Sequence, residues 1–162
     1  MKLSVLSMSV QQFEYMRTLA ERAYPYEGCG VLVGIPGEDH TAVTEVLEGR
    51  NLVTDRRHDR YELDPRDIIR AEKEARARGE EVVGFFHTHP DHPARPSQFD
   101  ADHAWAGYQY VVIAVHGGRQ VRATAWRLAE ANEPKSFVET ELQIPGGPAA
   151  HYNPPDLVAE ER

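Results

Sequence analysis

Cysteine is nearly missing from the sequence, since Cys29 is the only one among 162 residues. A lone cysteine excludes an internal disulfide, a Cys-x-x-Cys redox pair and a zinc site built from several thiolates. It fits a reducing compartment, so we expect a cytoplasmic protein. Long apolar runs are missing as well. Nothing approaches the roughly 18 apolar residues of a membrane span, and the serine-interrupted N-terminus does not resemble a signal peptide. We therefore expect no membrane partner.

Positive charge is in deficit: 18 Lys and Arg face 26 Asp and Glu, which gives a formal net charge of −8. This acidic balance argues against general binding of nucleic acid or of anionic membranes, because both are polyanionic. The length favours one domain and nearly excludes a (β/α)₈ barrel, which needs about 200 residues or more.

Helix signals occur at three places in the chain. Ser9 looks like an N-cap, with Gln12 completing a capping box, and a helix is predicted over residues 10–24. Asp64-Pro65 predicts a second helix that ends at Gly79. Ser97 predicts a short third helix that continues to about residue 106.

Apolar runs and alternating patterns predict the strands, which we place at 3–6, 30–35, 41–47, 61–63, 82–86, 108–115, 120–128 and 136–144. The order of strands and helices indicates an α/β fold, with a single mixed β-sheet flanked by helices. We expect one domain over residues 1–144. The Gly-, Pro- and acid-rich segment 145–162 is expected to be a flexible tail.

The most informative motif is His87-Thr88-His89-Pro90, at the end of an apolar strand. Residues two apart on a strand share a face, so the two imidazoles can share one cation. Asp100, one turn into the helix that follows Ser97, can point its carboxylate back at them. Two imidazoles and one carboxylate leave a fourth tetrahedral position open, as in catalytic zinc sites. Iron and manganese are alternative ions.

A histidine pair of this kind is weak evidence by itself, because His-Thr-His-Pro-Asp-His also reads as a solvated turn. Competing metal signatures are absent from the sequence: there is no His-Glu-x-x-His, and no Cys-x-x-Cys half of a zinc deaminase. The position of the pair at the end of a buried strand, with Ser97 and Asp100 returning at a helix start, favours a metal site.

Together, His87-x-His89-Pro90, six residues and Ser97-x-x-Asp100 resemble the full signature of the JAMM (MPN-plus) metalloprotease family. That family also carries a glutamate on an earlier strand, in a Glu-x-Cys-Gly context, which Glu27-Gly28-Cys29-Gly30 matches. The resemblance covers about residues 3 to 130. It implies the layered α/β fold of this family, similar to that of cytidine deaminases.

The resemblance implies a role for each matched residue. His87, His89 and Asp100 would bind one Zn²⁺ per chain. Glu27 would deprotonate the zinc-bound water and then deliver the proton to the leaving amine, and Ser97 would help to bind the oxyanion.

The implied reaction is hydrolysis of a peptide or isopeptide bond after the C-terminal glycines of a small ubiquitin-like protein. Short bacterial members are associated with β-grasp sulfur-carrier proteins. Only about eight residues separate Asp100 from the strand that begins near Tyr108. The long insert of ubiquitin-specific members is therefore missing, which favours a compact prokaryotic peptidase.

Two other functions compete with this one. A non-catalytic MPN-type scaffold would have lost metal ligands, and none is lost here. A JAMM-like domain of the DNA-repair-associated kind is disfavoured by the net charge of −8 and by the Glu-x-Cys-Gly segment. The roles of several further side chains stay open. Cys29 is either a small buried residue or a thiol nucleophile, and His92 and His103 are either surface residues or substitute ligands. The arginines of one loop either are solvated or line a cleft for a carboxylate: Arg56, Arg57 and Arg60.

Overall fold

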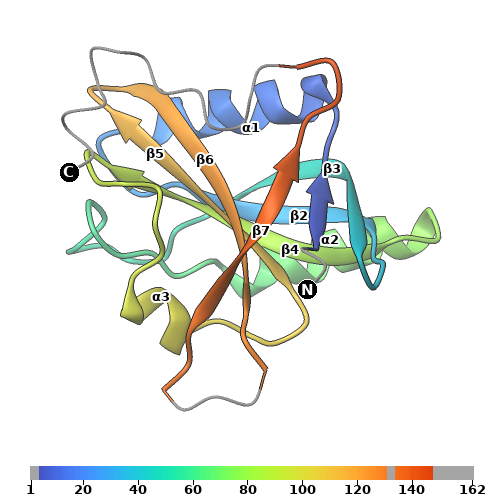
Figure 1. Ribbon diagram of the computed structural model, residues 1–162. Coiled ribbons are helices and arrows are strands. Elements are labelled where there is room, and N and C mark those ends of the chain that lie inside the picture. Colours follow the sequence, from blue (N-terminus) through green and yellow to red (C-terminus); the bar gives the residue numbers. More distant parts are fainter. Residues whose placement is uncertain (1–3, 131–133, 148–162) are drawn as a thin grey trace.

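The computed structural model describes residues 4–130 and 134–147 (Figure 1). Three helices and seven strands follow one another in the order β1 (Val5–Ser7), α1 (Val10–Ala23), β2 (Cys29–Ile35), β3 (His40–Gly49), α2 (Pro65–Ala77), β4 (Glu81–Pro90), α3 (Gln98–Asp102), β5 (Gln109–His116), β6 (Arg119–Leu128) and β7 (Phe137–Gln143). Within the described residues, every helix is too short or too polar to span a membrane. Most of the predicted flexible tail, residues 148–162, lies outside the described residues.

The seven strands form a closed barrel in the order β1-β3-β2-β4-β5-β6-β7. The prediction of an α/β fold, with a single mixed β-sheet flanked by helices in layers, is therefore wrong. Closure depends on the three-residue strand β1, which pairs in parallel with β3 on one side and with β7 on the other. A strand with one buried face has the same apolar alternation in an open sheet and in a barrel, so the sequence pattern does not show which edges meet.

Two apolar clusters hold α1 and α2 on opposite sides of the central strands β2 and β4 (Figure 1). Met16 and Leu19 of α1 pack in one cluster with Leu32, Phe86 and Ile113, while α2 contributes to the other cluster. All eight residues of β5 are buried. Strand β4, which carries the histidine motif, pairs antiparallel with β2 and in parallel with β5, so the motif lies on the rigid centre of the barrel.

The helix starts follow the predicted caps. Ser9 accepts a hydrogen bond from the Gln12 backbone N–H at 3.2 Å, and Asp64 caps α2 with Pro65 in the first turn. The predicted capping box at α1 is replaced by another contact: the Gln12 side chain accepts a hydrogen bond from the Val46 N–H of β3 at 2.7 Å. This contact fixes the start of α1 to the barrel wall.

Three predicted elements differ from the structure by more than two residues. Strand β4 continues past Phe86 to Pro90, because the parallel pairing with β5 extends to Val115. Helix α3 ends at Asp102 instead of near residue 106. The predicted strand at 61–63 is reduced to an isolated bridge between Asn51 and Leu63. Residues 50–64 thus form a loop whose two ends pair with each other.

Candidate metal centre

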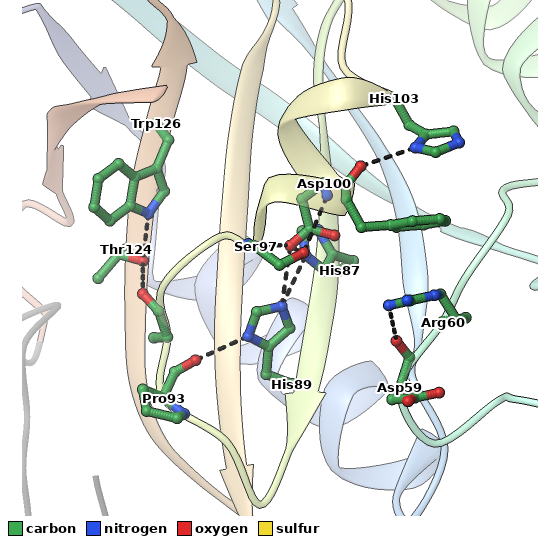
Figure 2. Close-up of polar contacts among 12 residues, drawn as sticks. Asp59, Arg60, His87, His89, Pro93, Ser97, Asp100, His103, Thr124 and Trp126 are labelled. Carbon is green, nitrogen blue, oxygen red and sulfur yellow. Dashed lines mark hydrogen bonds and ion pairs between the residues drawn. The ribbon is translucent and has the colours of Figure 1, made fainter. Parts of the chain in front are cut away.

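His87 and His89 project from the same face of β4, and their Nε2 atoms lie 3.2 Å apart. Asp100 of α3 reaches them from the other side: its Oδ2 lies 3.2 Å from Nε2 of His87 and 3.3 Å from Nε2 of His89 (Figure 2). Three potential ligand atoms thus form a nearly equilateral triangle. The sequence separation of two residues on a strand and the return at Ser97 account for this geometry.

A capping box fixes the orientation of Asp100. Ser97 caps α3 by accepting a hydrogen bond from the Asp100 N–H at 3.0 Å, and Oδ2 of Asp100 accepts one from the Ser97 N–H at 2.8 Å. The oxygen that faces the histidines is therefore held by the helix start itself. The Ser97 hydroxyl uses an oxygen lone pair in this cap, so its hydrogen can still be donated to another group.

The tautomer of His89 is set by a backbone carbonyl. Its Nδ1 lies 2.8 Å from the carbonyl oxygen of Pro93, which can only accept, so Nδ1 carries the hydrogen (Figure 2). In the neutral ring Nε2 then presents a lone pair to the Asp100 carboxylate. A cation between these atoms removes that repulsion, and a carbonyl bound to the distal nitrogen is the usual partner of a metal-binding histidine.

The triangle has the dimensions of a tetrahedral metal site. Bond lengths of 2.0–2.1 Å at tetrahedral angles place neighbouring ligand atoms about 3.3 Å apart. The separations in the structure are 3.2, 3.2 and 3.3 Å. The donor set of His87, His89 and Asp100 therefore fits zinc.

Glu27 completes the group. Its carboxylate and the two imidazoles bring potential ligand atoms within 4.8 Å of one another, and only 5% of its surface is exposed. Burial raises the pKa of Glu27 to about 8, and the nearby charge of Asp100 adds to the shift. A cation bound beside it would favour the ionised form. This carboxyl is thus placed to exchange a proton near neutral pH.

The pKa values of the other three members of the group shift in different directions. Burial lowers the pKa of His87. For His89, burial acts in the same direction, but the hydrogen bonds to Asp100 and Pro93 outweigh it and raise the pKa. For Asp100, burial acts to raise the pKa, but the charges and hydrogen bonds of the imidazoles bring it well below its usual range. The carboxylate of Asp100 is therefore ionised at any physiological pH.

A cavity of about 610 Å³ opens in front of the group, and Glu27, His89, Ser97 and Asp100 contribute to its lining. On the opposite side, the Tyr61 ring stacks on the His87 ring, with centroids 4.5 Å apart and planes 16° apart. Within the described residues, Nδ1 of His87 has no hydrogen-bond partner although it is buried. Tyr61 thus covers the His87 ring, while His89, Ser97 and Asp100 face the cavity.

The other candidate side chains lie outside this group. Cys29 is buried, and burial raises the pKa of its thiol to about 12, which opposes a role as a nucleophile. His103 bonds the Phe99 carbonyl oxygen on its own helix at 2.8 Å (Figure 2). Arg56 pairs with Asp59, and Arg57 lies over the ring of Tyr26. Arg60 lines the cavity.

Sequence reasoning missed the residues that hold this group in place. Tyr61 covers His87, and Asn51 and Thr88 bond the backbone beside Glu27. Tyr61 falls in a short alternating run, which is the only local signal among the three. Asn51 and Thr88 are 24 and 60 positions from their partners, so no local pattern points to them.

Thr88 holds the backbone next to Glu27, and the contribution of its hydroxyl to stability can be tested by mutation. Its Oγ1 accepts a hydrogen bond from the Gly28 N–H at 2.8 Å, and its own N–H donates to the Gly28 carbonyl oxygen. Replacing Thr88 with valine leaves the Gly28 N–H without its acceptor. We expect the free energy of unfolding to fall by about 1–2 kcal/mol in urea titrations. Thr88→Ser keeps the hydroxyl and serves as the control, and equal losses for both variants would rule out this hydrogen bond as the cause.

Comparison with known proteins places the chain in a family. Residues 9–129 match the prokaryotic homologues of the JAB domain. Desampylase from Haloferax volcanii is 34% identical over 116 residues, which cover 71% of this chain and 80% of that protein. The solution structure of a Desulfitobacterium hafniense protein superposes with a TM-score of 0.74 at 28% identity, covering 90% of this chain and 96% of the other. A Salinibacter ruber protein gives 0.63 at 32% identity, with 91% and 98% covered. The resemblance to the JAMM (MPN-plus) family is thus confirmed, and the chain belongs to its prokaryotic JAB-domain branch.

Proposed function

We propose that the protein is a zinc-dependent peptidase or isopeptidase that hydrolyses the amide bond after the C-terminal glycines of a small ubiquitin-like protein. The observation that carries this proposal is the triangle of His87, His89 and Asp100, with sides of 3.2–3.3 Å, beside the buried Glu27 carboxyl. The family match over residues 9–129 supports a single catalytic domain over residues 1–144.

His87, His89 and Asp100 would hold one Zn²⁺ through Nε2, Nε2 and Oδ2. When bound, zinc supplies a Lewis acid that polarises a carbonyl oxygen and lowers the pKa of water to about 7. The Pro93 carbonyl and the Ser97 N–H keep the ligand atoms of His89 and Asp100 aimed at one point. The site is thus organised before an ion enters.

Glu27 would act as the general base and then as the general acid. It would take a proton from the attacking water at one carboxylate oxygen and later give that proton to the leaving amine. Its burial beside the two histidines supports this role, because a cation bound there would favour the ionised form that takes the proton.

Ser97 would stabilise the oxyanion through its hydroxyl hydrogen. The residue is exposed on the wall of the cavity, and within its hydroxyl group the cap uses the oxygen but not the hydrogen. A hydroxyl fixed in this way does not need to reorganise when negative charge develops on the carbonyl oxygen.

The substrate class is inferred from the relative and from the compact α3 region. The name of the relative, desampylase, denotes removal of SAMP, and the JAMM family implies a ubiquitin-like protein as the group that is removed. Six residues separate α3 from β5 here, from His103 to Tyr108, so no long insert follows Asp100. We infer a β-grasp sulfur-carrier protein ending in Gly-Gly, released from an attached amino acid, peptide or lysine side chain.

The proposal is tested with a Gly-Gly-terminated β-grasp carrier joined through that end to a reporter peptide, and with the same carrier joined to a lysine side chain. Purified protein with about one zinc per chain is expected to release the carrier from at least one of them. Metal analysis that finds no bound zinc, together with no cleavage of either conjugate after added zinc, would favour a non-catalytic scaffold.

A further inference from the structure

The segment that carries Glu27 lies just before β2 and outside the pairing of the barrel strands. Its backbone groups therefore need other partners. The Glu27 N–H donates to the Arg57 carbonyl oxygen, and Thr88 bonds both polar groups of Gly28. The remaining group, the Glu27 carbonyl, accepts a hydrogen bond from Nδ2 of Asn51 at 3.2 Å. The position of the proposed base thus depends partly on one side chain from a distant loop.

Asn51 uses its complete hydrogen-bonding capacity in four contacts. Nδ2 donates to the carbonyl oxygens of Glu27 and Arg60, both at 3.2 Å. Oδ1 accepts from the N–H groups of Val53 and Glu62, both at 3.0 Å. Two of these partners can only accept and two can only donate, so the orientation of the amide is fixed. A half-buried side chain with all four bonds made is held rigidly.

Two of the four contacts bracket Tyr61, because they involve the residue before it and the residue after it. The Tyr61 ring is the one that stacks on the His87 ring. The Arg60 guanidinium also lies over the ring of Phe99 in α3, 4.1 Å from its centroid. A single amide therefore connects the base-bearing backbone to the aromatic cover of a proposed zinc ligand.

We propose that Asn51 is a positioning residue for the proposed reaction: it holds the Glu27 carboxylate and, through Tyr61, the His87 ring in their working geometry. This inference rests on the proposed function. Asn51 touches neither substrate nor metal and acts only through the backbone of Glu27 and of residues 60–62. Displacing a catalytic group by about 1 Å can cost up to 100-fold in rate, so the loss of this tie affects turnover more than substrate binding.

Two variants distinguish the hydrogen bonds that Asn51 donates, to Glu27 and Arg60, from those that it accepts within its own loop. Asn51→Ala removes all four hydrogen bonds and adds no charge. Asn51→Asp can still accept from Val53 and Glu62 but cannot donate to Glu27 and Arg60. Asp55→Asn, at an exposed position on the same loop, is the matched control and is expected to behave as the wild type.

The measurements are kcat and KM at saturating zinc, zinc affinity, and amide hydrogen exchange. For both Asn51 variants we expect kcat to fall about 10- to 100-fold with KM within about threefold of the wild type. Zinc binding is expected to weaken about tenfold, as for other residues that orient a ligand. Loss of the bond to the Glu27 carbonyl frees this segment to open, so exchange of the Glu27 N–H, which donates to the Arg57 carbonyl oxygen, is expected to accelerate in both variants. Exchange of the Glu62 N–H, which donates to Asn51 itself, is expected to accelerate mainly in Asn51→Ala.

A purely structural role predicts a different result: a lower melting temperature with kcat and KM unchanged per zinc-loaded molecule. That result would overturn the inference, as would unaltered exchange at Glu27. If the wild type hydrolyses neither conjugate, the proposed function fails separately. Exchange at Glu27 and zinc affinity then decide the inference, and wild-type values for both in Asn51→Ala would overturn it.

Discussion

Replacing Glu27 with glutamine is expected to reduce the rate of hydrolysis of the carrier conjugate about 10²- to 10⁴-fold, while one zinc ion per chain stays bound. Glutamine has nearly the same size and shape as glutamate, so the buried position is kept. It cannot take a proton from water, which removes the step that the buried carboxyl supports. The measurement is kcat for the variant and the wild type, with zinc content determined on the same samples.

The zinc measurement decides between two geometries. Glu27 lies close enough to His87 and His89 to be a ligand itself, with potential ligand atoms within 4.8 Å. Asp100 lies 3.2 and 3.3 Å from their Nε2 atoms, which matches the spacing of neighbouring ligands in a tetrahedral zinc site, so we assign it as the ligand. Loss of zinc from Glu27→Gln would make Glu27 a ligand and leave the base unassigned. Retained zinc with full activity would show that Glu27 is not the base.

Replacing Asp100 with asparagine is expected to weaken zinc binding by more than about 100-fold and to remove activity with it. Mutation of a residue that only hydrogen-bonds a metal ligand typically weakens metal binding 10- to 100-fold, so a larger loss of zinc affinity indicates direct coordination. The neutral amide can still accept the Ser97 N–H hydrogen bond, which keeps the α3 cap largely intact. Competition with a zinc chelator of known affinity gives the dissociation constants.

Asp102→Asn is the matched control, since it makes the same chemical change on the same helix. Asp102 is exposed and accepts a hydrogen bond from Gln98 at 2.9 Å, away from the histidines. The control is expected to bind zinc as tightly as the wild type. Equal zinc affinities for the two variants would contradict the assignment of Asp100.

The geometry of the metal group could be predicted because each part is encoded locally. His87 and His89 face the same way since they are two apart on one strand, and the capping box between Ser97 and Asp100 spans three residues. Helix caps at Ser9 and Asp64 follow the same kind of short-range rule. Glu27 was found only through its Glu-x-Cys-Gly context, because a glutamate before a strand carries no signal of its own.

Closure of the barrel and support of the site could not be predicted, because both depend on contacts between distant segments. The prediction of a layered sheet flanked by helices is wrong because β1, three residues long, pairs with β3 and β7 at once and closes the barrel. The hydrogen bond from Asn51 to Glu27 spans 24 positions, and the bond from Gly28 to Thr88 spans 60. Neither has a periodic or spacing signature in the sequence.

The alternatives make different physical demands. A non-catalytic scaffold has no need for a buried carboxyl beside three aligned ligand atoms, and the structure retains both. A nucleic-acid function needs a positive surface, whereas the net charge is −8. The hydrolase proposal accounts for the triangle, for Glu27 and for the cavity in front of them.

The most direct measurement is the mass of the carrier after incubation with zinc-loaded protein. We expect a product that ends at the second glycine, formed by the wild type but not detected in the same time with Glu27→Gln or after removal of zinc. Cleavage at another position, or the same product from Glu27→Gln and from zinc-free protein, would contradict it.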